Sequence, residues 1–104
     1  VKITCLMVMT DNAINSGATT PDSIVKGRNG KTVEILNTDA EGRLILSDVL
    51  DYACDLKPDG IIDAATLTGA CLVALGNQVT GVMGNNQKWI DTILKAAQES
   101  DEYM

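Results

Sequence analysis

Apolar and polar positions divide the first part of the chain into three predicted elements. Residues 1–10 form an almost continuous apolar run rich in β-branched side chains, which predicts a buried strand. Asn, Ser, Gly, Thr and Pro dominate residues 11–22, which predicts a loop. Residues 23–26 and 31–36 alternate in character on either side of Gly27-Arg28-Asn29-Gly30. An Asn-Gly pair between two such runs predicts a β-hairpin.

From Arg43 the apolar residues recur with a period of 3.6, which predicts an amphipathic helix. The apolar stripe of this helix contains Ile45, Val49, Tyr52, Ala53 and Leu56. Asp48, Asp51 and Asp55 fall on the other face, so the helix is expected to pack by one side only. Lys57 precedes Pro58 and is thereby disfavoured in a helical conformation, so the helix should end there.

The second half of the chain alternates between predicted strands and helices. Strands are predicted over 60–65 and 79–83, and a short apolar helix over 67–75 lies between them. Residues 87–99 form a second amphipathic pattern that turns Ile90, Ile93, Leu94 and Ala97 inward. This alternation with short connections predicts an α/β fold, in which a parallel sheet is covered by helices on both faces.

Composition narrows the kinds of partner that this chain can have. Fourteen acidic residues against eight basic ones give a net charge of −6, and no basic cluster is present. A nucleic-acid partner is therefore unlikely, because phosphate binding needs Lys and Arg on one face. The uncharged stretch 64–87 is long enough to suggest a membrane span. Polar residues and the Gly76-Asn77 turn signal interrupt it, so a buried strand–helix–strand unit is the better interpretation and no membrane partner is expected.

The cysteines and the absence of histidine limit the chemistry further. Cys5, Cys54 and Cys71 are odd in number, far apart and surrounded by apolar residues. We expect reduced, buried thiols in a cytosolic protein rather than disulfides. Because the chain has no His, a metal ion would be held here by oxygen ligands or by a nitrogen from elsewhere.

Asp39, Glu41 and Arg43 are the strongest candidates for a functional site. In an extended backbone, residues two apart point the same way, so these three side chains are expected to converge. Two carboxylates that converge beside an arginine recover their desolvation cost if a cation lies between them, and a metal ion is the usual one. Gly42 lies where the helix begins, so free N–H groups and the positive end of the helix dipole are expected beside the site. The alternatives are a solvated charged loop and a simple salt bridge for Arg43.

Thr66-Leu67-Thr68-Gly69-Ala70 is the second candidate segment. It follows the predicted strand 60–65, and α/β folds bind ligands at the carboxyl ends of parallel strands. Read alone, the same residues are equally consistent with a helix start that a threonine caps. Both interpretations remain open at this point.

Several segments resemble the leucyl aminopeptidases, a dinuclear-metal cytosolic family, and they occur in family order. The segments are Gly-Lys-Thr-Val-Glu (30–34), Asn-Thr-Asp-Ala-Glu-Gly-Arg-Leu (37–44), Leu-Ile-Leu-Ser-Asp-Val-Leu (44–50) and Ala-Ala-Thr-Leu-Thr-Gly-Ala (64–70). The resemblance implies an α/β catalytic domain with a mixed, largely parallel sheet. It also implies a cytoplasmic homo-hexamer that releases N-terminal amino acids from peptides.

The resemblance also implies roles for individual residues. Asp39 would ligate one of two divalent metal ions, Glu41 would bridge both, and Arg43 would hold a bicarbonate ion that serves as general base. The residues that would line the substrate cleft are Asn37, Thr66, Leu67 and Gly69. Zinc is the expected metal, and an oxygen-only set also suits manganese or magnesium.

The family's other metal ligands, a lysine and two aspartates, and its catalytic lysine belong to motifs that this chain does not contain. Residues 1–104 are therefore expected to be part of a larger metalloaminopeptidase catalytic domain. Two other roles stay open. Some bacterial relatives are DNA-binding architectural proteins, and a catalytically silent subunit is the other alternative because the chain carries only part of the active site.

Overall fold

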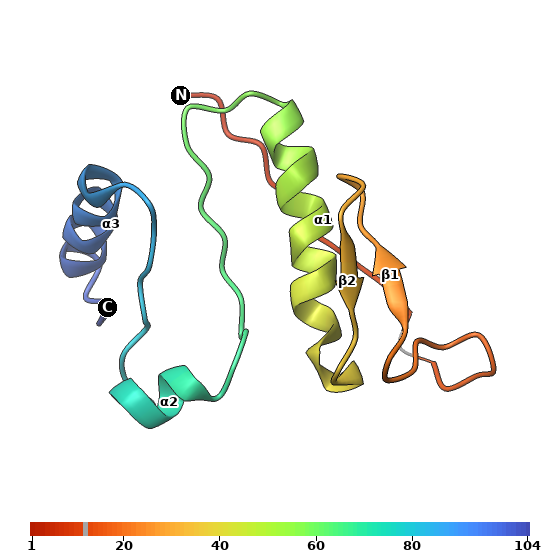
Figure 1. Ribbon diagram of the computed structural model, residues 1–104. Helices are drawn as coiled ribbons and strands as arrows, with labels where there is room; N and C mark the ends of the chain where they lie inside the picture. The colour runs from red at the N-terminus through yellow and green to blue at the C-terminus, as the bar shows by residue number, and fades with distance from the viewer. Residues whose placement is uncertain (12) are drawn as a thin grey trace. The chain divides into compact units, whose positions relative to one another are not determined.

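The computed structural model describes residues 1–11 and 13–104, so Asn12 of the predicted loop 11–22 lies outside the described residues. The chain forms two compact units, Val1–Ala65 and Thr66–Met104. The elements follow in the order β1 (Ile24–Lys26), β2 (Thr32–Glu34), η1 (Thr38–Ala40), α1 (Glu41–Asp55), α2 (Ala70–Leu75) and α3 (Gln87–Glu99) (Figure 1).

The predicted β-hairpin is confirmed. β1 and β2 pair antiparallel, with Val25 opposite Val33. Gly27 N–H donates to the Lys31 carbonyl at 2.8 Å, and Gly30 N–H donates to the Gly27 carbonyl at 2.9 Å. Gly30 has φ +82°, a left-handed conformation that glycine adopts without strain, so the hairpin loop is a turn closed by this residue.

Pairing continues beyond the two short strands. Ile35 N–H donates to the Ser23 carbonyl at 2.8 Å, and Asp22 N–H donates to the Ile35 carbonyl at 2.7 Å. The Ile35 side chain is only 4% exposed. Because both its backbone and its side chain are held, Ile35 fixes the position from which the chain leaves the hairpin toward Asn37.

α1 begins two residues before the predicted start and ends where it was predicted to end. Leu56 N–H caps the last turn by donating to the carbonyls of Ala53 and Cys54. Lys57 then takes φ +51°, and Pro58 follows it. In the predicted apolar stripe, Ala53 is buried and Ile45 and Val49 are half-buried, as expected. Tyr52 and Leu56 are exposed, so the stripe is covered only in part by the described residues.

The prediction that α1 packs by one side only was wrong. Asp48, Asp51 and Asp55, on the face expected to be solvated, all accept hydrogen bonds from Arg28 in the hairpin loop. Charged residues can hold two elements together when a single arginine serves several carboxylates. The acidic face is thus also a contact face.

The predicted strands at 1–10, 60–65 and 79–83 are not formed as paired strands in the structure. In the described part of the chain the sheet has two strands, β1 and β2, and they are antiparallel. A strand is stable only within a hydrogen-bonded ladder, and among the described residues none of these three segments belongs to one. The parallel ladder expected from the alternation pattern is therefore not built by these residues alone.

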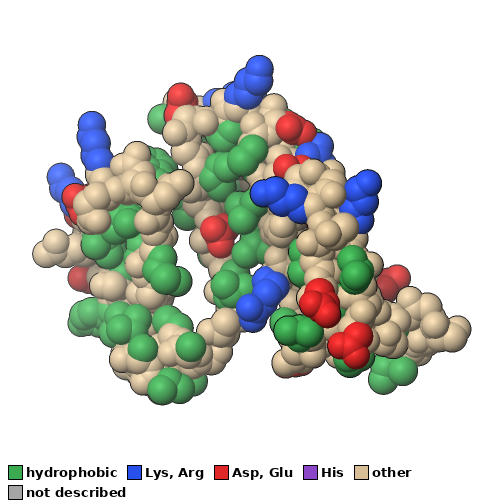
Figure 2. All heavy atoms as spheres, in the orientation of Figure 1, with side chains coloured by type: hydrophobic (Ala, Val, Ile, Leu, Met, Phe, Trp, Pro, Cys, Tyr) green, Lys and Arg blue, Asp and Glu red, His purple; other side chains and the backbone are tan. Residues whose placement is uncertain are grey.

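Few apolar side chains are buried within the described residues. Ile35, Ala53 and Ala97 form the buried hydrophobic set, and Figure 2 shows many hydrophobic side chains at the surface. Cys5, Cys54 and Cys71 are free and exposed, so the prediction that they are buried was wrong. The exposed apolar side chains and the exposed cysteines have one cause. The larger sheet that was expected to cover them is not formed by the described residues.

In the second unit, α2 is shorter than the predicted helix 67–75, and α3 matches its prediction. Asn86 caps α3 by accepting the Trp89 N–H at 3.2 Å, and Ala97 is buried on its inner face. At the end of α3 the chain turns, and the Tyr103 carbonyl accepts the Thr80 N–H at 2.8 Å. No helix in the described part of the chain has the length and hydropathy that a membrane span requires.

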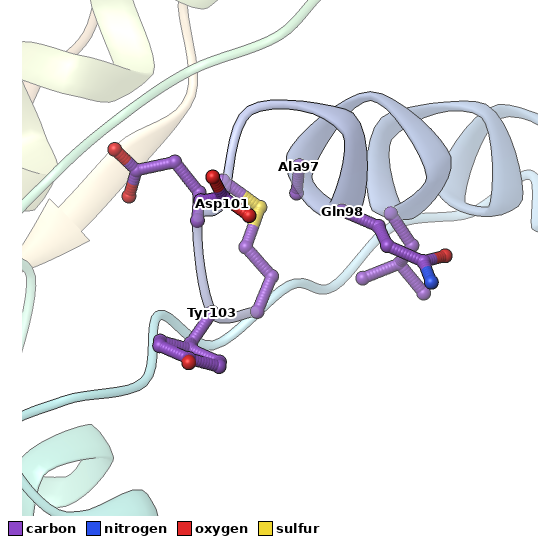
Figure 3. Close-up of a pocket in the computed structure, with 7 residues that line it drawn as sticks. Ala97, Gln98, Asp101 and Tyr103 are labelled. Atoms are coloured by element: carbon purple, nitrogen blue, oxygen red, sulfur yellow. The ribbon is translucent and has the colours of Figure 1, made fainter.

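A partly open pocket of about 380 Å³ lies at the end of α3 (Figure 3). Its lining residues are Leu94, Ala97, Gln98, Asp101, Glu102, Tyr103 and Met104. None of the site residues predicted from the sequence belongs to this lining.

Candidate active site

The segment that carries the predicted metal ligands is a capped turn rather than an extended strand. Asn37 is extended (φ −141°, ψ 116°), and its Oδ1 accepts the Asp39 N–H at 2.9 Å. Ala40 N–H donates to the Asn37 carbonyl at 3.2 Å. This is the geometry that asparagine favours at the start of a helical turn, so the chain becomes helical one residue after Asn37.

The predicted convergence of Asp39, Glu41 and Arg43 by strand alternation was therefore wrong. Asp39 lies in η1, and Glu41 and Arg43 lie in the first turn of α1. In a helix, residues two apart are separated by about 200° around the axis, so neighbours in this set point in different directions. The physical reason is the cap on Asn37, which starts the helical turn before the acidic residues.

The side chains of this segment are open to solvent. Asn37, Asp39, Glu41 and Arg43 are all exposed. Arg43 forms no ion pair with another described residue, so its alternative role as a salt-bridge partner finds no support there. Within residues 1–11 and 13–104, no three acidic, Cys or His side chains cluster closely enough to hold a metal ion.

The start of α1 favours negative charge and offers space. Ala40, at the N-cap, supplies no side-chain hydrogen bond, so the first N–H groups of the helix are not capped by that side chain. A Cβ at Gly42 would meet nothing within 4 Å. An anion or a ligand carboxylate would be stabilised here by the helix dipole. The donor set fits a divalent cation in kind, because both carboxylates are oxygen donors, but two ligands do not complete a coordination shell.

The second candidate segment lies in the other unit and opens α2. Gly69 occupies the N-cap position of α2 and makes no side-chain hydrogen bond, whereas Oγ1 of the preceding Thr68 accepts the Ala70 N–H at 3.2 Å. The threonine thus contacts the helix start from one residue before the cap. Thr66, Leu67 and Gly69 are exposed, and a Cβ at Gly69 would meet nothing within 4 Å. The structure thus brings Asn37, Asp39, Glu41 and Arg43 together in one segment of the first unit, and Thr66, Leu67 and Gly69 in one segment of the second.

Arg28 is a contact residue that the sequence pattern did not single out. It joins the hairpin loop to Asp48, Asp51 and Asp55 on α1. The signal was available in the spacing of the three aspartates, because positions i, i+3 and i+7 lie on one helical face. Three aspartates on one helical face indicate a basic partner, and Arg28 in the hairpin loop is that partner.

Comparison with known proteins assigns the family. The model of the cytosol aminopeptidase family, catalytic domain, matches residues 1–104. The chain belongs to the cytosol aminopeptidase family. The predicted resemblance is thereby confirmed, and it extends over the whole chain.

Relatives and a solved structure agree with this family. A probable cytosol aminopeptidase of Sulfurihydrogenibium sp. (strain YO3AOP1) is 57% identical over 99 residues, which are 95% of this chain and 20% of that protein. A cytosol aminopeptidase of Pseudomonas aeruginosa (strain PAO1) is 50% identical over 102 residues, 98% of this chain and 21% of that protein. The chain spans about a fifth of the length of these cytosol aminopeptidases.

The solved structure confirms the fold class of this family member. A mutant of tomato leucine aminopeptidase superposes with a TM-score of 0.86 and 48% identity, over 88% of this chain and 18% of that one. The predicted α/β class, as part of a larger aminopeptidase domain, is therefore confirmed, even though the described residues pair only two strands of their own.

Proposed function

We propose that this chain is part of the catalytic domain of a metal-dependent, leucyl-type aminopeptidase that releases N-terminal amino acids from peptides. The observation that carries this proposal is the match of the cytosol aminopeptidase catalytic domain to all 104 residues. The exposed carboxylates at the open start of α1 support it, because they are free to take part in a site completed by other residues.

In this proposal Asp39 and Glu41 would hold two divalent metal ions, Asp39 as a ligand of one and Glu41 as a ligand shared by both. Zinc is the proposed metal, and manganese or magnesium are the alternatives that oxygen ligands allow. The bound ions would supply Lewis-acid activation of a water molecule and of the scissile carbonyl. Arg43 holds a bicarbonate ion as general base, and the positive end of the α1 dipole favours the same anion.

Asn37, Thr66, Leu67 and Gly69 bind the peptide. Asn37 Oδ1 is used by the Asp39 N–H, so the side-chain NH₂ is the group left for substrate. Thr66 offers a hydroxyl and Leu67 an exposed apolar surface. We also propose a cytoplasmic homo-hexamer. The names of the matched relatives, cytosol aminopeptidases, support the cytoplasmic location, and the hexamer rests on the resemblance to the family.

A non-enzymatic role, as a DNA-binding architectural protein or a silent subunit, is not favoured. The relatives that match at about half identity are named aminopeptidases. The net charge of −6 opposes binding to phosphates.

The test compares carboxylate-to-amide variants in the full-length protein that carries this chain. Asp39→Asn and Glu41→Gln should each lower turnover of a leucine anilide by at least about a hundredfold, because each removes a charged ligand. Asp59→Asn, a matched change at an exposed aspartate outside the segment, should leave turnover unchanged. Wild-type turnover in either ligand variant would contradict the assignment. A gel shift with DNA on the same protein tests the alternative.

A further inference from the structure

Arg28 makes a dense set of contacts for an exposed loop residue. Its Nη2 donates to Asp55 Oδ2 at 2.6 Å, and its Nη1 contacts Asp51 Oδ2. Its backbone N–H donates to Asp48 Oδ1 at 2.9 Å. The guanidinium carbon lies 5.4 Å from the centre of the Tyr52 ring, within the range of a cation–π contact. We call Arg28, Asp48, Asp51, Tyr52 and Asp55 the Arg28 cluster.

The backbone around Arg28 is shaped for this contact. A Cβ on Gly27 would lie 3.1 Å from Asp48 Oδ1, so glycine at this position allows Asp48 to reach the Arg28 N–H. Gly30 closes the turn with a positive φ. Within the described residues, every ion pair between the hairpin loop and α1 is made by Arg28. Figure 1 shows the hairpin running alongside α1.

The Arg28 cluster lies away from the proposed metal ligands. At 1.5 Å per residue, Asp48 is about 10 Å and Asp55 about 20 Å along the helix from Glu41. Arg28 therefore does not touch the proposed site. Any effect it has on that site must pass through the hairpin and α1.

The connection between these two elements is short and is held at both ends. Ile35 is buried and paired with Ser23 and Asp22 on one side. Asn37 caps η1 on the other side, and α1 follows without a break. Since residues 36–40 join two elements directly, a change in the angle between hairpin and helix must be absorbed by these residues.

We propose that Arg28 is a positioning residue, which holds the hairpin loop against α1 and thereby sets the conformation of residues 37–43, the end of the connection and the first turn of α1. That these residues bind metal rests on the proposed function, whereas the contacts of Arg28 do not. An arginine suits this task because its planar fork serves two carboxylates at once and stacks on an aromatic ring, which a lysine cannot do.

The charge of Arg28 is secure under ordinary conditions. The hydrogen bond to Asp55, and then that to Asp51, raises the pKa of the Arg28 guanidinium above its ordinary value. The Asp51 and Asp55 side chains are 28% and 62% exposed, so replacing Arg28 leaves neither carboxylate fully buried without a partner. The variants below are therefore expected to fold.

The experiment measures amide hydrogen exchange in the full-length, metal-free protein. Arg28→Ala should accelerate exchange in residues 37–43 by about tenfold, the scale on which groups that orient a site act. Arg28→Lys should fall between Arg28→Ala and wild type, because one ammonium restores one ion pair. Lys31→Ala, a matched change of a basic residue in the same loop region, should leave these residues unchanged. Asp55→Asn provides a milder variant with the same expected pattern if Arg28→Ala does not fold.

Kinetics add a second readout. The Arg28→Ala variant should lower kcat by about tenfold and change KM by less than about twofold, because it disturbs the reacting groups rather than peptide binding. Faster exchange confined to residues 24–34, equal behaviour of Arg28→Ala and Lys31→Ala, or an unchanged kcat despite faster exchange at 37–43 would overturn the proposal. If the wild-type protein releases no amino acid, the proposed function fails, and the exchange pattern alone decides on Arg28.

Discussion

Asn37 holds Asp39 in place: its Oδ1 accepts the Asp39 backbone N–H at 2.9 Å. The bond joins a residue proposed to bind substrate to one proposed to bind metal. It also starts the helical turn that leads into α1. Asn37 therefore has a structural role that is independent of any substrate.

Replacing Asn37 should separate these two roles. Asn37→Ala removes the cap and should lower the free energy of unfolding by about 1 kcal/mol, whereas Asn37→Ser keeps a capping oxygen and should lose much less. Both variants lack the amide NH₂, so both should raise KM if that group binds peptide. Urea unfolding and anilide kinetics on the full-length protein measure the two effects. Equal stability of Asn37→Ala and wild type would show that the cap contributes nothing.

Gly30, in the hairpin turn, and Gly42, within the predicted site segment, should respond to substitution in opposite ways. Gly30 has φ +82°, so Gly30→Ala is strained and should destabilise the protein by about 1 kcal/mol. Gly42 lies in α1 with open space around its Cα, so Gly42→Ala should be neutral or stabilising by up to about 1 kcal/mol. Thermal unfolding of both variants checks this contrast. A loss of stability in Gly42→Ala would mean that other residues of the full-length protein, outside these 104, pack against this glycine.

Local signals in the sequence were sufficient for the elements that satisfy their own hydrogen bonds. The hairpin follows from Asn29-Gly30, and the end of α1 follows from Lys57-Pro58, because both are determined by nearby residues. The strands at 1–10, 60–65 and 79–83 depend on partners distant in sequence. Their apolar character was a sound indication of burial in a sheet, but the described residues do not provide that sheet.

The candidate site was likewise predicted only in part from the sequence. The motif at 37–44 identified the family, which the comparisons confirm. The alternation of charges predicts an extended conformation, and this prediction was wrong because the hydrogen bond from the Asp39 N–H to Asn37 Oδ1 starts a helical turn there. Arg28 was missed since its partners lie 20 to 27 residues away in sequence, and only the folded chain brings them together. The roles of Asp39, Glu41 and Arg43 stay predictions.

Arg43 offers a test of the proposed bicarbonate ion. In full-length protein freed of carbonate, turnover of a leucine anilide should rise as bicarbonate is added, because the anion would act as general base. Arg43→Ala should be slow and should respond little to bicarbonate, since the guanidinium that holds the anion is gone. Lys57→Ala, a change of an exposed cation beyond the end of α1, serves as control and should respond as wild type does. An equal response of Arg43→Ala and wild type would remove bicarbonate from the proposal.

The 104-residue chain by itself should bind zinc weakly and hydrolyse no aminoacyl substrate. It supplies two proposed acidic ligands, whereas each cation of a dinuclear site needs several oxygen or nitrogen donors. Asp39 and Glu41 are neighbouring like charges in one segment, and the α1 dipole offsets only part of their repulsion. With Ile35, Ala53 and Ala97 as the buried apolar residues of the described part, the chain should also unfold with little cooperativity. Isothermal titration with zinc, a leucine-anilide assay and a thermal melt measure these properties. Submicromolar binding at two sites, or turnover that Glu41→Gln abolishes, would show that the 104 residues hold a complete site.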